Sequence, residues 1–441
     1  MCKRFTAGAA LLLALALLTT TGASAWQGAP AIKPPDATAT LNATEDVLKT
    51  VSRMRELEIK QPVKSAFKTR DEIEQSIIRD LDESTPPEEF EASQKTLVKL
   101  GLVPTDFQLR DYVVKLLREQ VAGFYEPKTK EFYLAAWLPL AEQKKVMAHE
   151  LMHALQDQHF NLRRFEKWPK GDADAELAAH ALVEGEATLI MILYDLEQSG
   201  LRGIDITKID SLTERLLDND SEASDPNYPV LSAAPRVLRE NLQFPYIYGA
   251  GFTQAVLKSG AWRGLDDAYT TLPASSEQIM HPEKYLAHEM PVKIALADLG
   301  PVFGKGWKRA DEDVNGEFGY FVILSEFLPK SIARTAAAGW GGDDYAFYEN
   351  PASGTSTLVQ YTTWDTPGDA REFFTAYCTR SEQRYRLKRN TDDKATRRVY
   401  ETSEGLVSIE LRDKDVVMVE GAQNRKQLAG LETRVWQSKK K

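Results

Sequence analysis

The sequence predicts an α+β fold, with a mainly α-helical domain that contains a short edge hairpin and a smaller C-terminal α+β domain. Helix-capping patterns mark the segments that follow residue 43. Two aromatic-rich runs within 121–135 are typical of a hairpin. Runs typical of β-strands gather near the C-terminus, at 356–364, 397–402, 406–411 and 416–420. At 441 residues the chain is long enough for two domains, which we place at 44–300 and 301–441.

The N-terminus has the features of a secretory signal. Two basic residues precede an apolar stretch, residues 5–18, and an Ala-Ser-Ala run ends at residue 25. We expect residues 1–25 to be removed and the mature chain to be periplasmic or extracellular, without insertion into a membrane. The apolar stretch is shorter than the ~20 residues of a membrane-spanning helix, although an uncleaved anchor is the alternative. Residues 26–43 are rich in Ala, Pro and Thr and are predicted to form a flexible leader.

The composition excludes one class of partner and one kind of cross-link. The chain has 65 acidic and 55 basic residues, a formal net charge of −10. Because no basic tract offsets this charge, we expect no binding to nucleic acid or to an anionic membrane. Cys2 lies in the signal and only Cys378 remains, so no intramolecular disulfide is expected and the core must provide the stability.

Capping residues and hydrophobic patterns place the first helices. Gly101 is positioned to end a helix. The hairpin at 121–135 is followed by a helix at 141–158 and, after a polar loop, by a second helix at about 174–197. Three segments resemble capping boxes: Thr69-x-x-Glu72, Thr85-Pro86-Pro87-Glu88 and Thr105-x-x-Gln108.

The second half of the chain changes character after residue 300. Residues 217–229 have loop composition and are predicted to form a mobile flap. A helical stretch from 301 extends to 338, and the Gly-rich run at 339–345 is expected to break it. Asp413-Lys414-Asp415 predicts the turn of a hairpin between the last two β-runs.

The run His149-Glu150-Leu151-Met152-His153 has the spacing of a catalytic metal site. Residues four apart on a helix project from nearly the same side, ~6 Å apart along the axis, so the two histidines can hold one metal ion. Catalytic zinc binds imidazole nitrogen and keeps a position for water. Glu150 points ~100° away and is predicted to be the general base toward that water. The apolar run at 146–155 indicates burial, which is costly for ionisable groups that are neither paired nor metal-bound.

A third protein ligand is expected from the helix at about 174–197. Glu184 and Glu186 lie ~200° apart on a helix, so only one of them can bind the same ion. Gly185 between them lowers helix stability by ~1 kcal/mol relative to Ala, which indicates that another backbone or the substrate passes close by. A buried ion pair with Arg or Lys is the alternative role for either glutamate.

The motif at 149–153 and the run Glu184-Gly185-Glu186-Ala187 resemble the gluzincin metallopeptidases, which bind zinc through two histidines and a downstream glutamate. This resemblance implies a zincin-like catalytic domain in which His149, His153 and Glu184 bind one Zn²⁺ per chain. The stretch 149–157 also resembles the thermolysin-like enzymes and suggests that Asp157 orients a ligand imidazole.

The chain departs from the gluzincin pattern at several positions. Val183 and Thr188 replace residues that surround the third ligand in thermolysin-like enzymes, which leaves the outer partners of the metal ligands open. No Gly-Ala-Met-Glu-Asn motif precedes the helix, which favours an endopeptidase over an aminopeptidase.

A closer resemblance covers most of the mature chain. It is to a family of secreted bacterial proteins classed as zinc peptidases, and it says little about the substrate. The segments that carry it are Gly123-Phe-Tyr-Glu-Pro127, 149–160, Tyr246-Ile-Tyr-Gly249, 276–285 and Gly339-Trp-Gly-Gly-Asp343.

Further residues are candidates for the site. Gluzincins use a tyrosine or histidine beyond the third ligand to donate a hydrogen bond to the oxyanion, and Tyr248, Tyr246 and His281 are candidates by their order in the chain. His159 has the spacing of the third metzincin histidine, but Gln156 stands where that pattern needs a glycine.

We therefore expect a secreted zinc-dependent peptidase that hydrolyses peptide or protein substrates with zinc-activated water and Glu150 as general base. The hairpin at 121–135 offers an edge strand with which an extended peptide can pair. The alternative is a non-catalytic zincin-fold scaffold or binding protein of the cell envelope. Glu150 argues against that alternative, because a purely structural metal site needs no base.

Overall fold

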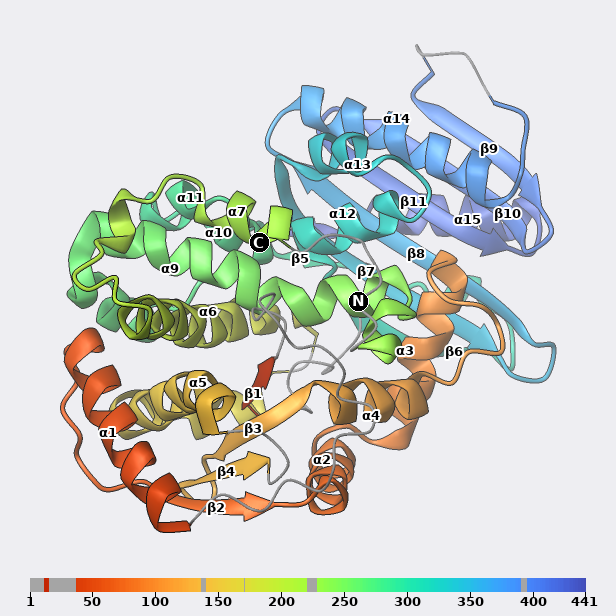
Figure 1. Cartoon of the computed structure of the whole chain (residues 1–441). Helices are drawn as coiled ribbons and strands as arrows, with labels where there is room; N and C mark the ends of the chain where they lie inside the picture. Colours follow the sequence, from red (N-terminus) through yellow and green to blue (C-terminus); the bar gives the residue numbers. More distant parts are fainter. Residues whose placement is uncertain (1–11, 16–36, 136–139, 170, 220–227, 390–394) are drawn as a thin grey trace.

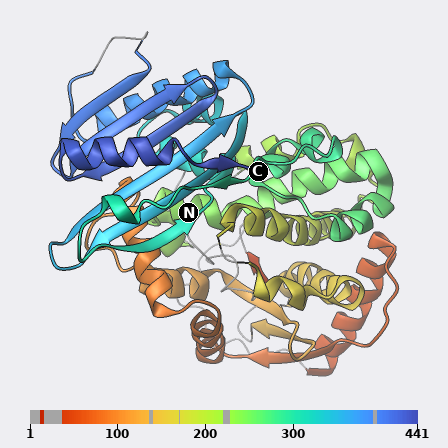
Figure 2. The ribbon, with the colours of Figure 1, turned by 180° about the vertical axis from the view of Figure 1, so that it is seen from behind.

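The computed structural model describes residues 12–15, 37–135, 140–169, 171–219, 228–389 and 395–441. The fold is α+β, as the sequence predicts. Figure 1 shows a small sheet with helices at one end of the molecule and a larger sheet at the other. The long helices α6 (Ala173–Gln198) and α9 (Arg236–Thr270) run between them. From behind, Figure 2 shows α15 (Arg425–Val435) on the face of the large sheet opposite α14 (Pro367–Arg384).

Several predictions fall partly outside these residues. Of the predicted signal, residues 1–25, the structure describes only Leu12–Leu15, which form β1. Residues 37–43 of the predicted leader begin helix α1 (Ala37–Arg55) and so belong to a regular element. Most of the predicted flap at 217–229 lies outside the described residues. Removal of the signal and export of the chain stay predictions.

The small sheet confirms the predicted hairpin. Strands β3 (Val121–Glu126) and β4 (Glu131–Ala135) pair antiparallel, with Lys130 in the left-handed conformation at the turn. Strand β2 (Lys64–Lys68) pairs parallel with β4, and β1 pairs antiparallel with β3, which gives the order β1-β3-β4-β2. Helix α5 (Leu140–Phe160) packs against β3, which brings the His149–His153 motif beside this sheet.

The helical part confirms the predicted helices at 141–158 and 174–197 as α5 and α6. Of the three predicted capping boxes only Thr69 forms one, at the start of α2. Thr85 instead ends α2, and α4 begins after Gln108 without a side-chain cap. Gly101 ends α3 with a positive φ, as predicted. The remaining helices of this part are α2 (Arg70–Ser84), α3 (Pro87–Leu100), α4 (Leu109–Gln120), α7 (Leu212–Asn219), α8 (Pro229–Ser232), α10 (Ser276–Met280) and α11 (Pro282–Leu286).

The large sheet has six antiparallel strands in the order β6-β7-β8-β11-β10-β9. The four predicted β-runs are confirmed, and residues 413–414 form the turn of the β10–β11 hairpin. The strands are β6 (Lys308–Asp313), β7 (Trp340–Asn350), β8 (Thr355–Trp364), β9 (Arg397–Thr402), β10 (Gly405–Arg412) and β11 (Asp415–Ala422). The short pieces are β5 (Ile294–Ala295), which pairs with β12 (Lys439–Lys440), and 3-10 turns at Leu162–Lys167, Ile206–Lys208 and Gly300–Val302.

The prediction for residues 301–345 was partly wrong. The helical stretch is divided into α12 (Gly316–Ser325) and α13 (Lys330–Ala337), and β6 precedes it. The Gly-rich run does end α13, but it then starts strand β7. Gly342 is required there because a Cβ would lie 2.1 Å from the carbonyl oxygen of Val292. Asp343 is buried and accepts hydrogen bonds from the backbone N–H groups of Asn315 and Gly316, which compensates for its low strand propensity.

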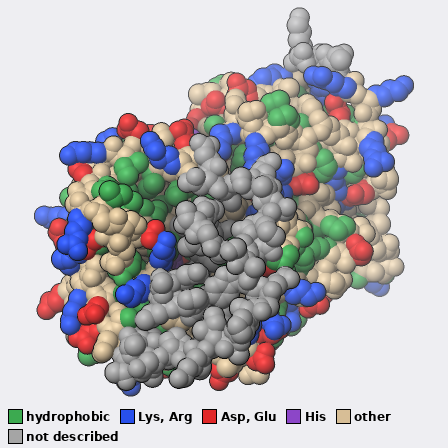
Figure 3. All heavy atoms as spheres, viewed as in Figure 1, with side chains coloured by type: hydrophobic (Ala, Val, Ile, Leu, Met, Phe, Trp, Pro, Cys, Tyr) green, Lys and Arg blue, Asp and Glu red, His purple; other side chains and the backbone are tan. Residues whose placement is uncertain are grey.

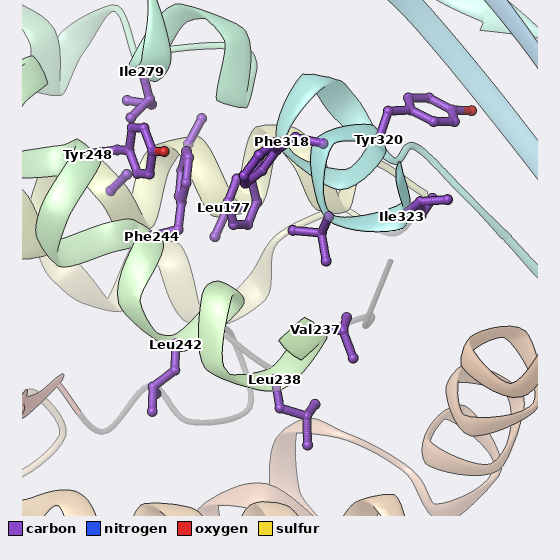
Figure 4. Packing of buried hydrophobic residues seen from close by; sticks show 14 of the residues in the cluster. Leu177, Val237, Leu238, Leu242, Phe244, Tyr248, Ile279, Phe318, Tyr320 and Ile323 are labelled. Carbon is purple, nitrogen blue, oxygen red and sulfur yellow. The ribbon is translucent and has the colours of Figure 1, made fainter. Parts of the chain in front are cut away.

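One hydrophobic core continues from the helical part into the C-terminal part. Figure 4 shows Phe244 and Tyr248 of α9 against Phe318 of α12, with Ile279 of α10 nearby. The cluster extends through buried residues from Ile73 to Met418. The boundary predicted between residues 300 and 301 thus falls inside a shared core, and its meaning as a domain division stays a prediction.

Helix α6 is the most apolar long element of the described chain. By length and composition it is long and apolar enough to cross a membrane, but 89% of its most apolar 18-residue window is buried inside the protein. On the described part of the face in Figure 3, basic and acidic side chains are interspersed.

Candidate metal centre

The motif on α5 is buried, as its apolar surroundings predict. His149 is 1% exposed, and Glu150 and His153 are 0% exposed. The neighbouring Met147, Ala148, Leu151 and Met152 are buried as well and pack against the core. Because a buried polar group without a partner is costly, partners for the side chains of the motif are expected on the elements around α5.

Three potential ligand atoms converge at this site. The Nε2 atoms of His149 and His153 are 3.0 Å apart, and Oε2 of Glu184 lies 3.1 Å from the first and 3.4 Å from the second. All three side chains are buried. In a tetrahedral zinc site with ligand bonds of ~2.0 Å, neighbouring ligand atoms are about 3.3 Å apart. Two imidazoles and one carboxylate at this spacing therefore fit a catalytic zinc ion.

The electrostatics of these groups favour the deprotonated forms that bind a metal. Burial raises the pKa of Glu184, but His153 and His149 outweigh burial and lower that pKa to about 2. Burial lowers the pKa of His149. A bound metal ion would displace the imidazole protons, and the carboxylate and both imidazoles would then present lone pairs to it.

The crossing of α6 and α9 explains Gly185 and places Glu184. A Cβ on Gly185 would lie 2.0 Å from the carbonyl carbon of Gly249, and a Cβ on Gly249 would lie 2.1 Å from the oxygen of Ala181. The backbone expected to pass close to Gly185 is therefore that of α9. This close approach also brings Tyr246, one turn before Gly249, to the site.

Tyr246 is the candidate oxyanion donor that the structure brings to the candidate metal ligands. Its ring stacks on His149 with the centroids 5.9 Å apart. Its hydroxyl is hydrogen-bonded to Glu184, and its pKa is well above the usual range because of burial and the charges of Glu184 and Glu150. The hydroxyl thus keeps its proton at neutral pH.

The structure does not bring Tyr248 or His281 to the three ligand atoms. Tyr248 is two positions from Tyr246, so it points to another side of α9, where its hydroxyl accepts a 3.4 Å hydrogen bond from Arg334. Nε2 of His281 lies 2.9 Å from Oε1 of Glu317. Arg334 belongs to α13, and His281, between α10 and α11, has a side chain that is 34% exposed.

Glu150 sits between the motif helix and the small sheet. Its Oε2 accepts a 2.7 Å hydrogen bond from the backbone N–H of Tyr125 on β3. This contact holds the carboxylate at the side of α5 that faces the sheet, about 100° round the helix from His149.

The outer partners of the ligands differ from the prediction. Asp157 accepts hydrogen bonds from the Tyr125 hydroxyl at 3.1 Å and from the Leu162 N–H at 2.9 Å, so it orients no ligand imidazole. Gln156 instead contacts the imidazole of a candidate ligand, since its Oε1 lies 2.7 Å from Nδ1 of His153. Sequence reasoning missed this role, although a Gln three residues after a ligand on a buried helix was the available signal.

The alternative third ligands have other partners. Glu186 is fully buried and forms an ion pair with Arg55, while the Tyr269 hydroxyl donates to it at 2.5 Å. Nε2 of His159 lies 2.8 Å from the carbonyl oxygen of Glu58, near the end of α5. Because Glu186 and His159 have these other partners, Glu184 is the candidate third ligand that lies beside His149 and His153.

A second group of acidic residues is satisfied by the protein itself. Carboxylate oxygens of Glu277, Glu289 and Asp365 lie within 4.8 Å of one another. The ammonium of Lys284 is 2.7 Å from Glu277, 2.7 Å from Glu289 and 2.6 Å from Asp365. A lysine thus occupies the position that a cation would take.

Comparisons with known proteins identify only the C-terminal part. Residues 302–432 match a family described as Domain of unknown function (DUF8575), which includes the six-stranded sheet. No curated protein and no solved structure matches the chain.

Proposed function

We propose that this chain is a secreted, gluzincin-like zinc peptidase in which His149, His153 and Glu184 hold one zinc ion. The observation that carries the proposal is the spacing of the three buried ligand atoms, 3.0, 3.1 and 3.4 Å. Among the described residues no Lys or Arg forms an ion pair with Glu184, in contrast to Glu186 with Arg55. The resemblance of the motifs to the gluzincins agrees with this ligand set.

The residues around the ligands supply the other functions that peptide hydrolysis needs. Bound zinc supplies a Lewis acid that polarises the peptide carbonyl and activates water. Glu150 accepts the proton of the attacking water as general base, and the Tyr125 N–H holds its carboxylate in place.

Tyr246 is the residue that we propose as the hydrogen-bond donor to the oxyanion. Of the three candidates by chain order it alone stacks on a ligand, His149, and its buried hydroxyl stays protonated. Tyr248 and His281 have other partners, Arg334 and Glu317.

The edge of β3 that faces away from β4 is the proposed place for the peptide substrate. Strand β2 pairs with the outer edge of β4, and β1, from the predicted signal, pairs with the outer edge of β3. In the full chain Leu12–Leu15 lie antiparallel along this edge, which supports its ability to pair with an extended peptide. A chain that lacks residues 1–25 should therefore cleave peptides faster than the full chain, and equal rates would contradict this role of β3.

Metal content per chain is the decisive first measurement. We expect about one zinc in the wild type, none in Glu184→Ala, and an unchanged content in His159→Ala. Loss of zinc with His159 instead would favour a metzincin-like ligand set. A wild type without zinc would favour a scaffold of the cell envelope.

The Glu150→Gln variant separates an enzyme from a metal-binding scaffold. It should keep its zinc because Glu150 is no ligand, while the rate of peptide hydrolysis falls about 10²–10⁴-fold. Hydrolysis at the wild-type rate would remove Glu150 from the catalytic residues.

A further inference from the structure

The Gln156 side chain connects a proposed zinc ligand to a buried carboxylate. Its Oε1 is 2.7 Å from Nδ1 of His153, and its Nε2 is 2.8 Å from Oε2 of Glu186. Gln156, His153 and Glu186 are each 0% exposed. These contacts run from the motif helix α5 to α6, behind the atoms that face the metal position.

The acceptors around Gln156 fix the direction of the hydrogen bonds that link His153, Gln156 and Glu186. Its Nε2 donates to the carbonyl oxygen of Val183 at 3.0 Å as well as to Glu186. Neither group can donate, so the amide nitrogen must face them and Oε1 must face His153. An amide oxygen only accepts, so Nδ1 of His153 carries the proton. In the neutral imidazole Nε2 then presents its lone pair toward Glu184 and His149.

Glu186 is itself held from the other side. It forms an ion pair with the buried Arg55 of α1, and the Tyr269 hydroxyl donates to it at 2.5 Å. Arg55 also contacts Asp266 at 2.5 Å and lies 4.8 Å from the ring centroid of Trp262. The acceptor of the Gln156 amide is thus an anchored carboxylate.

We infer that Gln156 is a positioning residue that fixes the tautomer and ring orientation of His153 for zinc binding. This inference rests on the proposed zinc site. Metal-bound histidines commonly donate their second N–H directly to a carboxylate or a backbone carbonyl. Here an amide lies between, so Glu186 fixes the orientation without placing its charge against the ring. For His149 no such partner of Nδ1 occurs among the described residues.

The test compares Gln156→Met with the matched control Gln158→Met. Gln158 lies two residues further along α5 and bonds to Lys60 and Gln61 at the surface, far from the ligand atoms of His153. Zinc affinity, measured by competition with a chelator, should fall about 10–100-fold in Gln156→Met and stay unchanged in the control. Wild-type affinity in a folded Gln156→Met protein would overturn the inference.

The tautomer of His153 gives a readout that does not depend on zinc. Long-range ¹H–¹⁵N spectra of the zinc-free wild type should show the proton on Nδ1, and Gln156→Met should lose this preference. If Gln156→Met does not fold, Gln156→Asn replaces it, because it keeps an amide but is one methylene too short to bridge His153 and Glu186. An unchanged Nδ1–H tautomer in a folded variant would refute the role of Gln156.

Failure of the zinc site and failure of this inference give different results. A wild type that binds no zinc refutes the proposed function and removes the metal that Gln156 would serve. A wild type that binds zinc, together with variants of equal affinity and tautomer, refutes the inference alone.

Discussion

Two buried carboxylates, Glu184 in the candidate metal centre and Glu420 in the large sheet, share a pKa of about 2 but differ in their partners. Glu420 is 3.0 Å from Arg380 and 2.8 Å from Arg384, two permanent cations of the protein. Glu184 faces two imidazoles at 3.1 and 3.4 Å. The first cluster is complete without a ligand, whereas the second has the donors of a cation site.

The largest difference between Glu184 and Glu420 is expected in the free energy of unfolding when each carboxylate is replaced by an amide. Glu420→Gln should lower the free energy of unfolding by about 3–5 kcal/mol, because it leaves buried guanidinium groups uncompensated. Glu184→Gln should abolish zinc binding but destabilise the zinc-free protein at neutral pH less than Glu420→Gln does, because imidazoles can lose their charge whereas guanidinium groups cannot.

Urea titrations of the zinc-free proteins measure both effects. The control is Arg53→Gln, which removes a guanidinium from a partly exposed pair with Glu197. A zinc-free Glu184→Gln protein as unstable as Glu420→Gln would show that Glu184 has a structural role and would remove the contrast.

Acid should destabilise the sheet cluster over a defined pH range. Burial raises the pKa of Glu420, but Arg380 and Arg384 outweigh burial and lower that pKa from 4.5 to about 2. A folded-state pKa below the unfolded one stabilises the protein above about pH 4.5. Roughly 3 kcal/mol should be lost as the pH falls from there toward 2. The difference in unfolding free energy between wild type and Glu420→Gln should shrink over this range; a constant difference would contradict the assignment.

The helix crossing behind Glu184 should tolerate no side chain. Gly185→Ala places a Cβ 2.0 Å from Gly249, so α6 and α9 must separate, at a cost of about 1–3 kcal/mol in unfolding free energy. Zinc affinity should fall as well, since Glu184 moves with α6. Gly260→Ala on α9 is the control, because nothing lies within 4 Å of its Cβ. A Gly185→Ala protein as stable as this control would show that the crossing is not tight.

The smallest effect on the free energy of unfolding is expected from an exposed Arg–Glu pair, which has the same charged groups as the Glu420 cluster. Arg425 and Glu401 lie 2.7 Å apart with side chains 75% and 74% exposed. Arg425→Ala should change the unfolding free energy by at most about 0.5 kcal/mol, since water and salt screen the pair. A loss comparable with that of Glu420→Gln would mean that burial does not set the scale of these interactions.

Local sequence patterns predicted those helices and strands whose residues favour the secondary structure that they adopt. The helices around His149 and Glu184 follow from runs that are apolar nearly all round, and the hairpins at 121–135 and 405–422 follow from turn residues between β-type runs. Strand β7 was missed because Gly341, Gly342 and two aspartates disfavour a strand locally. Its pairing with β8 and the hydrogen bonds to Asp343 come from residues far away in the sequence.

The site was predictable to a similar extent. The spacing of His149, Glu150 and His153 and their apolar neighbours predicted a buried motif, and the resemblance to gluzincins supplied Glu184. The choice of Tyr246 over Tyr248 needed the crossing at Gly249. The role of Gln156 needed the position of Glu186 on another helix. Neither depends on a local pattern.

The contact between α3 and α14 has a consequence for the order of folding. The guanidinium of Arg380 donates to the carbonyl oxygen of Leu100, 280 residues earlier in the chain. The Lys99 ammonium likewise bonds to Glu404 at 3.1 Å. Contacts of such long range form slowly, because a large loop must close first. A ribosome must therefore synthesise the chain beyond residue 404 before both of these contacts can form, and until then this end of α3 lacks them.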